Sequence, residues 1–250
     1  MGKTMKLSGK TALVTGAASG FGKGIAARFA AEGAEVIVAD IHADAARDVA
    51  EEIGGRAVHC DVSRAESVAQ MALKLAESGI ALDILVNNAG TTHQPGPLDT
   101  ISEQEFDRVC AVNMKSVFLT AQAFVPGFKA RRRGSILNVA STAGVSPRPN
   151  LNWYNASKGW MITATKTMAI ELAPFGIRVN AINPVAGETP LLKTFMGEDT
   201  PERRAQFLAT IPLGRFSTPE DMGHAACFLV SDDAAMITGV AMEVDGGRCI

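Results

Sequence analysis

Three side chains between residues 141 and 158 have the types and spacing of an acid/base site: Ser141, Tyr154 and Lys158. Tyr154 and Lys158 are four residues apart, so on a helix they lie on one face, one turn from each other. A phenol normally loses its proton near pH ~10. An ammonium about 4 Å away contributes about 4 kcal/mol at an effective dielectric of about 20, which corresponds to about three pKa units. The pair therefore predicts a tyrosine whose pKa is lowered by Lys158 and which exchanges a proton with a substrate near neutral pH.

Ser141 follows an apolar run, residues 134–140, that is typical of a buried strand. Its hydroxyl would then lie at the carboxyl edge of that strand, where open parallel sheets bind their ligands. A tyrosine and a lysine at this spacing also occur by chance on many helices. The interpretation therefore depends on the elements around them.

The first such element is a glycine-rich turn near the start of the chain. A short apolar run at 10–15 precedes G-A-A-S-G-F-G, and a helical pattern begins at Gly22. A strand, a glycine loop and a helix in this order present backbone N–H groups and a helix dipole to a pyrophosphate. A tight strand-to-helix turn with no ligand is the alternative interpretation.

An acidic residue follows at the distance that a dinucleotide site requires. The next strand, 35–39, ends at Asp40, eighteen residues after Gly22. A carboxylate there can accept both hydroxyls of an adenosine ribose and would repel a 2′-phosphate. No Lys or Arg occurs among residues 17–19 or 41–42 to bind that phosphate. The loop and the acid together predict NAD rather than NADP.

The same alternation of strand and helix continues to the end of the chain. Further strands are expected at 57–60, 82–86, 134–140, 177–182 and 240–244, and helices at 43–54, 64–78, 102–131, 153–175 and 219–231. Asp61 after the third strand could accept from an adenine amino group or cap a helix. Asn87 and Asn88 can bond the backbone across strand ends. Asn113 inside the 102–131 helix indicates a bent helix or a functional amide.

This pattern predicts an α/β protein with one doubly wound parallel sheet, a Rossmann-type three-layer sandwich of about seven strands. We expect residues 1–250 to form a single dinucleotide-binding and catalytic domain. Between about 187 and 215 the pattern loosens, with Phe195 and Phe207 among charges and prolines. This segment is expected to be a lid over a small substrate, and an ordinary pair of surface helices is the alternative.

Composition excludes several other classes of protein. The chain has 250 residues, of which 47% are hydrophobic, and a formal net charge of −2, so we expect no nucleic acid or anionic membrane as partner. The four cysteines have neither metal nor disulfide spacing. Residues 1–9 lack the apolar core of a signal peptide, and a cytoplasmic location is expected.

The chain resembles the short-chain dehydrogenase/reductase family in motifs that occur in order over nearly its whole length: T-G-A-A-S-G-F-G, D-V at 61–62, N-N-A-G at 87–90, Asn113, Ser141, Y-x-x-x-K and a terminal D-G-G. The resemblance implies that Tyr154 is the general acid/base and that Ser141 holds the substrate oxygen. It implies that Lys158 also bonds the nicotinamide ribose and that Asn113 anchors a proton-relay water. Homotetramers or dimers built through the 102–131 and 153–175 helices are implied as well.

The resemblance also assigns residues to an NAD site and a substrate site. The residues expected to bind NAD are Gly16, Ser19, Gly20, Phe21, Gly22, Asp40, Ile41, Asp61, Val62, Asn88, Ala89, Gly90, Tyr154, Lys158, Pro184, Val185 and Thr189. His93, Trp153 and Met196 are expected to line the substrate site. Family members usually have glycine after the proline that Pro184 matches, so Val185 is a departure that puts the shape of this loop in question.

These residues favour an NAD-dependent enzyme that interconverts an alcohol with an aldehyde or ketone. A non-catalytic dinucleotide sensor and a cofactor-free dehalogenase-type lyase on the same scaffold are the alternatives from other classes. A 3-oxoacyl-carrier-protein reductase would need NADPH and a basic docking patch, and the sequence indicates neither. Three segments, G-E-T-P, M-G-E-D-T-P and D-G-G-R-C-I, are similar to those of the 4-formylbenzenesulfonate dehydrogenase subgroup.

Overall fold

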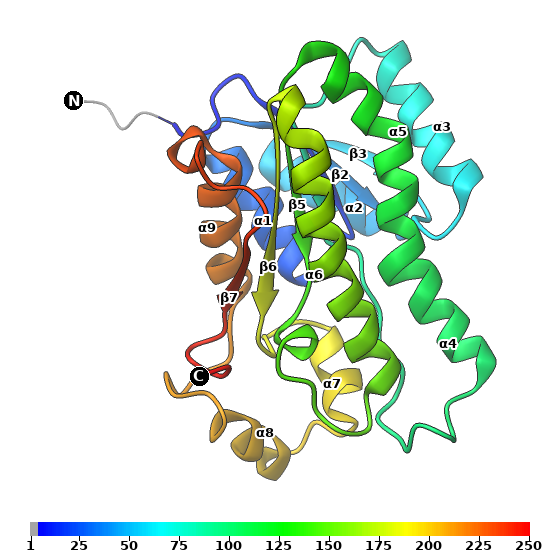
Figure 1. Cartoon of the computed structure of the whole chain (residues 1–250), viewed down its shortest axis with the longest axis vertical. Helices are drawn as coiled ribbons and strands as arrows, with labels where there is room; N and C mark the ends of the chain where they lie inside the picture. Colours follow the sequence, from blue (N-terminus) through cyan, green and yellow to red (C-terminus); the bar gives the residue numbers. More distant parts are fainter. Residues whose placement is uncertain (1–4) are drawn as a thin grey trace.

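A computed structural model describes residues 5–250. Residues 1–4 lie outside this range, and they belong to the segment 1–9 in which no signal peptide is expected. Seven strands form one sheet in the order β3-β2-β1-β4-β5-β6-β7, and all neighbours pair in parallel (Figure 1). The strands are β1 (Thr11–Thr15), β2 (Glu35–Asp40), β3 (Arg56–His59), β4 (Ile84–Asn87), β5 (Gly134–Val139), β6 (Ile177–Pro184) and β7 (Ala241–Val244). The predicted doubly wound parallel sheet is confirmed.

Helices cover both faces of the sheet. They are α1 (Gly20–Ala31), α2 (Ala43–Ile53), α3 (Ala65–Glu77), α4 (Glu103–Cys110), α5 (Ser116–Arg131), α6 (Asn152–Leu172), α7 (Leu191–Met196), α8 (Pro201–Leu208) and α9 (Pro219–Val230). One hydrophobic core joins α1, α2 and α9 to the sheet, and a second joins α3, α5 and α6 to its other face. Because the sheet is covered on both sides, its central strands are mostly apolar, and all four residues of β4 are buried.

The predicted helix at 102–131 is interrupted where Asn113 occurs. Residues Ala111–Lys115 form a π-helical turn between α4 and α5, so the helix is irregular at the position of Asn113. By length and composition alone, Glu103–Arg131 could cross a membrane. In the fold it forms part of one helical layer, with Val117, Leu119 and Phe128 buried. We therefore interpret it as a helix of the sandwich.

The strand order reverses between β1 and β4, and this reversal determines where a ligand can bind. At such a switch point the loops after neighbouring strands diverge and leave a crevice at the carboxyl edge of the sheet. The glycine loop follows β1, N-N-A-G follows β4, and Ser141 follows β5. The topology thus brings together the three motifs singled out in the sequence.

Candidate active site

The glycine loop after β1 has a shape that other residues could not adopt easily. Gly16 and Gly20 have φ angles of +62° and +54°, in the left-handed region. A Cβ on Gly22 would lie 2.2 Å from the Gly16 carbonyl oxygen. The side chain of Ser19, the residue before α1, makes no hydrogen bond to the first turn of the helix, and residues 19–22 line the cavity described below. This geometry fits a pyrophosphate.

Asp40 is fixed at the end of β2, beside the glycine loop. Its Oδ2 accepts a 3.0 Å hydrogen bond from the Ala18 backbone N–H, and its Oδ1 accepts one of 3.0 Å from that of His42. Both carboxylate oxygens are therefore oriented by the backbone. Asp61 is held similarly after β3, because its Oδ1 accepts hydrogen bonds from the N–H and the hydroxyl of Ser63. The residue at the N-cap of α3 is Arg64, not Asp61.

The two asparagines at the carboxyl end of β4 connect neighbouring strands. Asn88 Nδ2 donates to the carbonyls of Thr15 and Gly16 at 2.8 and 2.9 Å, and Asn87 Nδ2 donates to Asn138 Oδ1 at 2.9 Å. The Asn88 bonds hold the glycine loop against the N-N-A-G turn. Asn88 thus bonds the backbone across strand ends, as expected, whereas Asn87 bonds the side chains of Asn138 and Thr120.

Ser141, Tyr154 and Lys158 meet at the carboxyl end of β5. The Ser141 hydroxyl accepts from the Ala143 N–H at 3.1 Å and is near enough to the Tyr154 phenol to act on its pKa. Lys158 Nζ donates to the Val139 carbonyl at 2.8 Å and lies 6.0 Å from the centre of the Tyr154 ring. All three side chains are buried. The predicted helix and strand therefore bring the triad together.

The pKa of Tyr154 differs from the sequence-based prediction. Burial raises the pKa of the phenol, while the hydrogen bond from Ser141 and the charge of Arg148 act in the opposite direction. The predicted lowering by Lys158 is wrong for this structure, because a buried phenolate loses its hydration and the Lys158 ammonium is directed at Val139. Burial likewise lowers the pKa of Lys158, to about 8.

Asn113 is placed beside the triad by the π-helical turn. Its Oδ1 accepts from the Thr91 N–H at 2.8 Å, and its Nδ2 donates to the Thr91 carbonyl and to Ser157 Oγ, both at 2.9 Å. The amide thus joins the loop after β4 to α6. Its role as an anchor for a relay water remains a prediction.

One cavity of about 660 Å³ extends from the glycine loop to the triad. Every residue expected to bind NAD lines it, and Ser141 does too. Phe195, from the segment expected to be a lid, lines it as well. The sequence did not single out several other lining residues: His42, Cys60, Thr91, Arg108, Val112, Val139, Ala140, Ala186, Gly187, Pro190, Leu191 and Leu192. The glycine cradle, the fixed Asp40 and the length of the cavity fit a nicotinamide dinucleotide.

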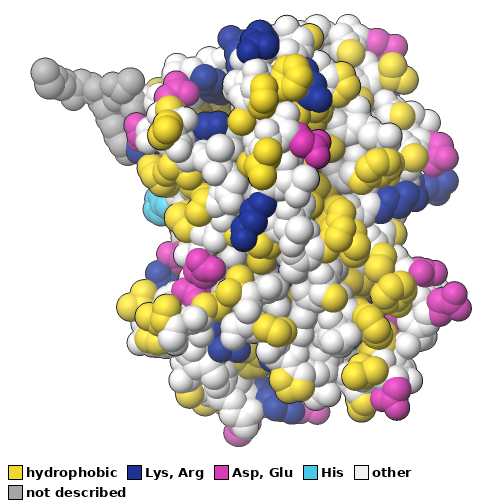
Figure 2. All heavy atoms as spheres, in the orientation of Figure 1, with side chains coloured by type: hydrophobic (Ala, Val, Ile, Leu, Met, Phe, Trp, Pro, Cys, Tyr) yellow, Lys and Arg dark blue, Asp and Glu magenta, His cyan; other side chains and the backbone are white. Residues whose placement is uncertain are grey.

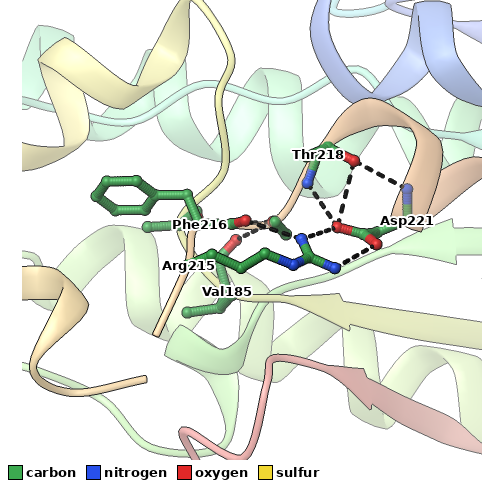
Figure 3. Close-up of polar contacts among 7 residues, drawn as sticks. Val185, Arg215, Phe216, Thr218 and Asp221 are labelled. Atoms are coloured by element: carbon green, nitrogen blue, oxygen red, sulfur yellow. Dashed lines mark hydrogen bonds and ion pairs between the residues drawn. The ribbon is translucent and has the colours of Figure 1, made fainter. Parts of the chain in front are cut away.

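The loop with Val185 is held by a second segment, shown in Figure 3. Gly187 and Ser217 form a parallel bridge, and the Ser217 hydroxyl donates to the Val185 carbonyl at 3.3 Å. Beside this bridge, Arg215 forms a bidentate ion pair with Asp221, which lies in the first turn of α9. The only described non-glycine residues with positive φ are Arg132 and Asn150. Val185 therefore needs no glycine conformation, and its side chain is buried with Leu192 and Met196 of α7.

The structure places none of the three predicted substrate residues on the wall of this cavity. His93 is fully buried, with Nδ1 2.8 Å from the Gln94 carbonyl and with no partner for Nε2. The Trp153 ring packs edge-on against Phe106 at 5.3 Å, and Met196 is buried in the cluster of α7 and α8. In their place Phe195 faces the cavity, with its ring 5.7 Å from that of Tyr154.

A family model described as enoyl-(acyl carrier protein) reductase matches residues 16–248. The 4-formylbenzenesulfonate dehydrogenase of Comamonas testosteroni is 51% identical, and the match covers 98% of this chain and all of that protein. The crystal structure of a short-chain type dehydrogenase/reductase from Mycobacterium marinum is 35% identical, with a TM-score of 0.90 and coverage of 98% and 97%. The chain belongs to the short-chain dehydrogenase/reductase family.

Another solved structure extends this likeness. A 3-ketoacyl-(acyl-carrier-protein) reductase from Brucella melitensis, crystallised with NADH, is 50% identical, with a TM-score of 0.91 and coverage of 98% and 100%. The resemblance seen in the sequence, including the subgroup, is thereby confirmed. The protein is a short-chain dehydrogenase/reductase, an oxidoreductase acting on a CH–OH or C=O group.

Proposed function

We propose that this short-chain dehydrogenase/reductase uses NAD to interconvert a primary or secondary alcohol with its aldehyde or ketone. The observation that carries the proposal is the continuity of one cavity from Gly16 and Asp40 at one end to Ser141, Tyr154 and Lys158 at the other. The cofactor supplies or accepts the hydride when bound. The protein must therefore hold the substrate oxygen and move one proton to or from it.

Tyr154 and Ser141 are placed to do both. Both residues line the same end of the cavity, and a substrate oxygen held between their hydroxyls would accept from both. Because burial raises the pKa of Tyr154, the phenol holds its proton at neutral pH and can donate it to a carbonyl oxygen. Lys158 supplies a positive charge beside the phenol and an N–H donor for a ribose. We therefore expect reduction to proceed at neutral pH and oxidation to increase toward alkaline pH.

The choice of NAD is supported by Asp40. Asp40 is 8% exposed and lines the cavity, and its carboxylate is held by two backbone donors. A 2′-phosphate on the adenosine ribose would approach this fixed negative charge. Release of the carboxylate to make room would break both backbone hydrogen bonds.

We also propose a cytoplasmic homotetramer or dimer. Hydrophobic side chains gather over the face formed by α4, α5 and α6 (Figure 2). Phe118 on α5 and Trp160 and Ile170 on α6 are 53%, 37% and 76% exposed. Apolar patches of this kind are typical of contacts between subunits.

The test is an NAD-coupled screen of alcohols and aldehydes, followed by Tyr154→Phe on the best substrate. The variant should fold and bind NAD but lose at least 10²-fold in turnover, the typical contribution of a positioned acid/base. A folded, NAD-saturated Tyr154→Phe protein with near-full activity would overturn the mechanism. A sensor would instead bind NAD and turn over no compound.

A 3-oxoacyl-carrier-protein reductase is the second candidate, since the Brucella relative carries that name. It predicts higher kcat/KM for a 3-oxoacyl thioester with NADPH than for any free aldehyde with NADH. Comparison of these two reactions on one enzyme preparation separates the candidates.

A further inference from the structure

Arg148 lies in the segment that joins Ser141 to Tyr154, and its side chain contacts the two helices that follow β6. Its guanidinium carbon is 3.9 Å from the ring centre of Phe195 on α7 and 4.5 Å from that of Phe207 on α8. One of its terminal nitrogens donates to the Phe195 carbonyl. The side chain thus joins the catalytic segment to α7 and α8, which lie at the end of the sandwich where β6 ends (Figure 1).

The backbone of Arg148 is fixed to the first turn of α6. Asn155, the residue after Tyr154, is buried, and its Nδ2 donates to the Arg148 carbonyl at 2.8 Å. The Phe195 ring in turn packs edge-on against the Tyr154 ring, with the two ring centres 5.7 Å apart. The contacts therefore form a closed loop: α6 holds Arg148, Arg148 holds Phe195, and Phe195 contacts the tyrosine of α6. This loop fixes the place of the Phe195 ring relative to the phenol.

Arg148 uses aromatic rings where buried cations normally use carboxylates. Burial lowers its pKa to about 10, so the side chain is still a cation at neutral pH. Among residues 5–250 it forms no ion pair, and the other cations that act on it are Arg203 and Arg248. A planar guanidinium stacks well on an aromatic face. The attraction of this cation is therefore directed at the rings of Phe195 and Phe207.

Arg148 itself does not line the cavity, but Phe195 does. Rings in edge-on contact at this distance leave no space between them, so no substrate group can pass between Tyr154 and Phe195. Phe195 forms the wall on the side of α7 together with Leu191 and Leu192, which also line the cavity. A substrate oxygen held at Tyr154 brings the reacting carbon next to this wall.

We propose that Arg148 is a positioning residue, which holds the Phe195 ring against Tyr154 from behind the wall and so limits branching at the carbon next to the reacting carbonyl. The proposal rests on the alcohol and aldehyde chemistry proposed above and concerns the shape of the substrate. Gly187 and Ser217 form a bridge at the base of the segment that carries α7 and α8. This bridge does not involve Arg148. Loss of Arg148 would therefore let the Phe195 ring move aside without detaching the two helices.

The first experiment compares the NADH-dependent reduction of propanal and trimethylacetaldehyde, which differ in branching next to the carbonyl. The unmutated enzyme should have a kcat/KM about tenfold or more higher for propanal, the usual effect of a pocket that excludes a methyl group. In Arg148→Met this ratio should fall about three- to tenfold, because the ring loses its stacked cation. A general loss of activity slows both aldehydes equally and leaves the ratio unchanged. An unchanged ratio overturns the proposal.

A double-mutant cycle tests whether Arg148 acts through Phe195. Phe195→Ala alone should lower the ratio at least as much as Arg148→Met, because it removes the wall itself. Arg148→Met in the Phe195→Ala background should then change the ratio by less than about twofold, since the two residues act as one unit. If Arg148→Met changes the ratio by the same factor in both backgrounds, Arg148 acts by another route and the proposal is wrong.

Arg203→Met is the matched control. Arg203 on α8 is near enough to act on Arg148 by its charge, but its side chain bonds Gln206 and, within residues 5–250, lies over no aromatic ring. The control removes a cation from the same region without loosening Phe195, and it should keep the ratio. An equal fall in Arg203→Met would mean that charge alone changes the preference, which contradicts the proposal. Circular dichroism and the thermal midpoint establish that each variant is folded, and Arg148→Gln is a second replacement in case methionine packs poorly.

The second experiment measures binding without turnover. Propanamide and trimethylacetamide carry the same groups as the two aldehydes but are not reduced, and their binding to the enzyme with NADH is followed by NADH fluorescence. Propanamide should bind about tenfold or more tighter to the unmutated enzyme, and the difference should shrink in Arg148→Met. If the amides behave in this way but no aldehyde is reduced, the proposed reaction is wrong and the role of Arg148 stands. If aldehydes are reduced with a preference that does not depend on Arg148, that role is wrong and the reaction stands.

Discussion

Lys158→Met should make the protein more stable while it removes activity. Burial lowers the pKa of Lys158 from 10.5 to about 8, because the ammonium loses hydration and its one hydrogen bond is to the neutral Val139 carbonyl. Each pKa unit corresponds to about 1.4 kcal/mol, so the buried charge destabilises the fold by about 3 kcal/mol at neutral pH. Loss of the bond to Val139 offsets part of this. We expect a net gain of about 1–2 kcal/mol for the methionine variant.

The sign of the pH dependence follows from the same values. Below pH 8 the lysine is charged in both folded and unfolded chains, and the folded state carries the whole penalty. Between about 8 and 10.5 the unfolded chain binds more protons, so the stability of the unmutated protein rises with pH. The difference between variant and unmutated protein should therefore be largest at pH 7 and shrink toward pH 10.

The assay is urea unfolding without NAD at pH 7, 8.5 and 9.5, at one fixed protein concentration. Lys158→Leu serves as a second apolar replacement, in case methionine packs poorly. A methionine variant that is less stable at pH 7, or a difference that stays constant with pH, would refute the reasoning. Either result would mean that the ammonium is already compensated in the folded protein.

Three further predictions follow from other parts of the structure. Asp40→Ala combined with Ile41→Arg should shift cofactor preference from NAD toward NADP, measured as the ratio of kcat/KM for the two; equal use of both by the unmutated enzyme would contradict the role of Asp40. Asp221→Asn should destabilise by about 1 kcal/mol at pH 7, because the hydrogen bond and charge of Arg215 lower the pKa of Asp221 to about 2 and the pair is partly exposed (Figure 3). That contribution is present above about pH 4 and is lost as pH falls through 2, so acid unfolding curves of variant and unmutated protein should converge there. Light scattering should give a mass of two or four chains, and a value near the 26.2 kDa of one chain would contradict the assembly.

The sheet and the cofactor end of the site could be predicted because their signals are local. Buried parallel strands are continuous apolar runs, and each predicted strand end lies within two residues of the observed one. The glycine loop and Asp40 follow such strands directly, so their place at the carboxyl edge is determined by the topology. Asn113 could be singled out for the same reason: a poor helix former within an apolar helix marked the π-helical turn.

The substrate end could not be predicted in this way. Phe195 and Phe207 lie in the segment expected to be a lid, but their contacts with Arg148 join segments up to 59 residues apart that form no sequence motif, so only packing shows that they meet. His93 and Met196 were chosen by their position relative to motifs. Position along the chain does not determine which way a loop side chain points, and the structure buries both away from the cavity wall.

The pKa of Tyr154 shows where reasoning from spacing is incomplete. A lysine one helical turn away indicates a nearby charge, and the structure does place that charge beside the ring. The spacing cannot show that the same fold removes the phenol from water, and in this site that effect outweighs the others. It also cannot show that Arg148, outside the motif, acts on the phenol together with Ser141.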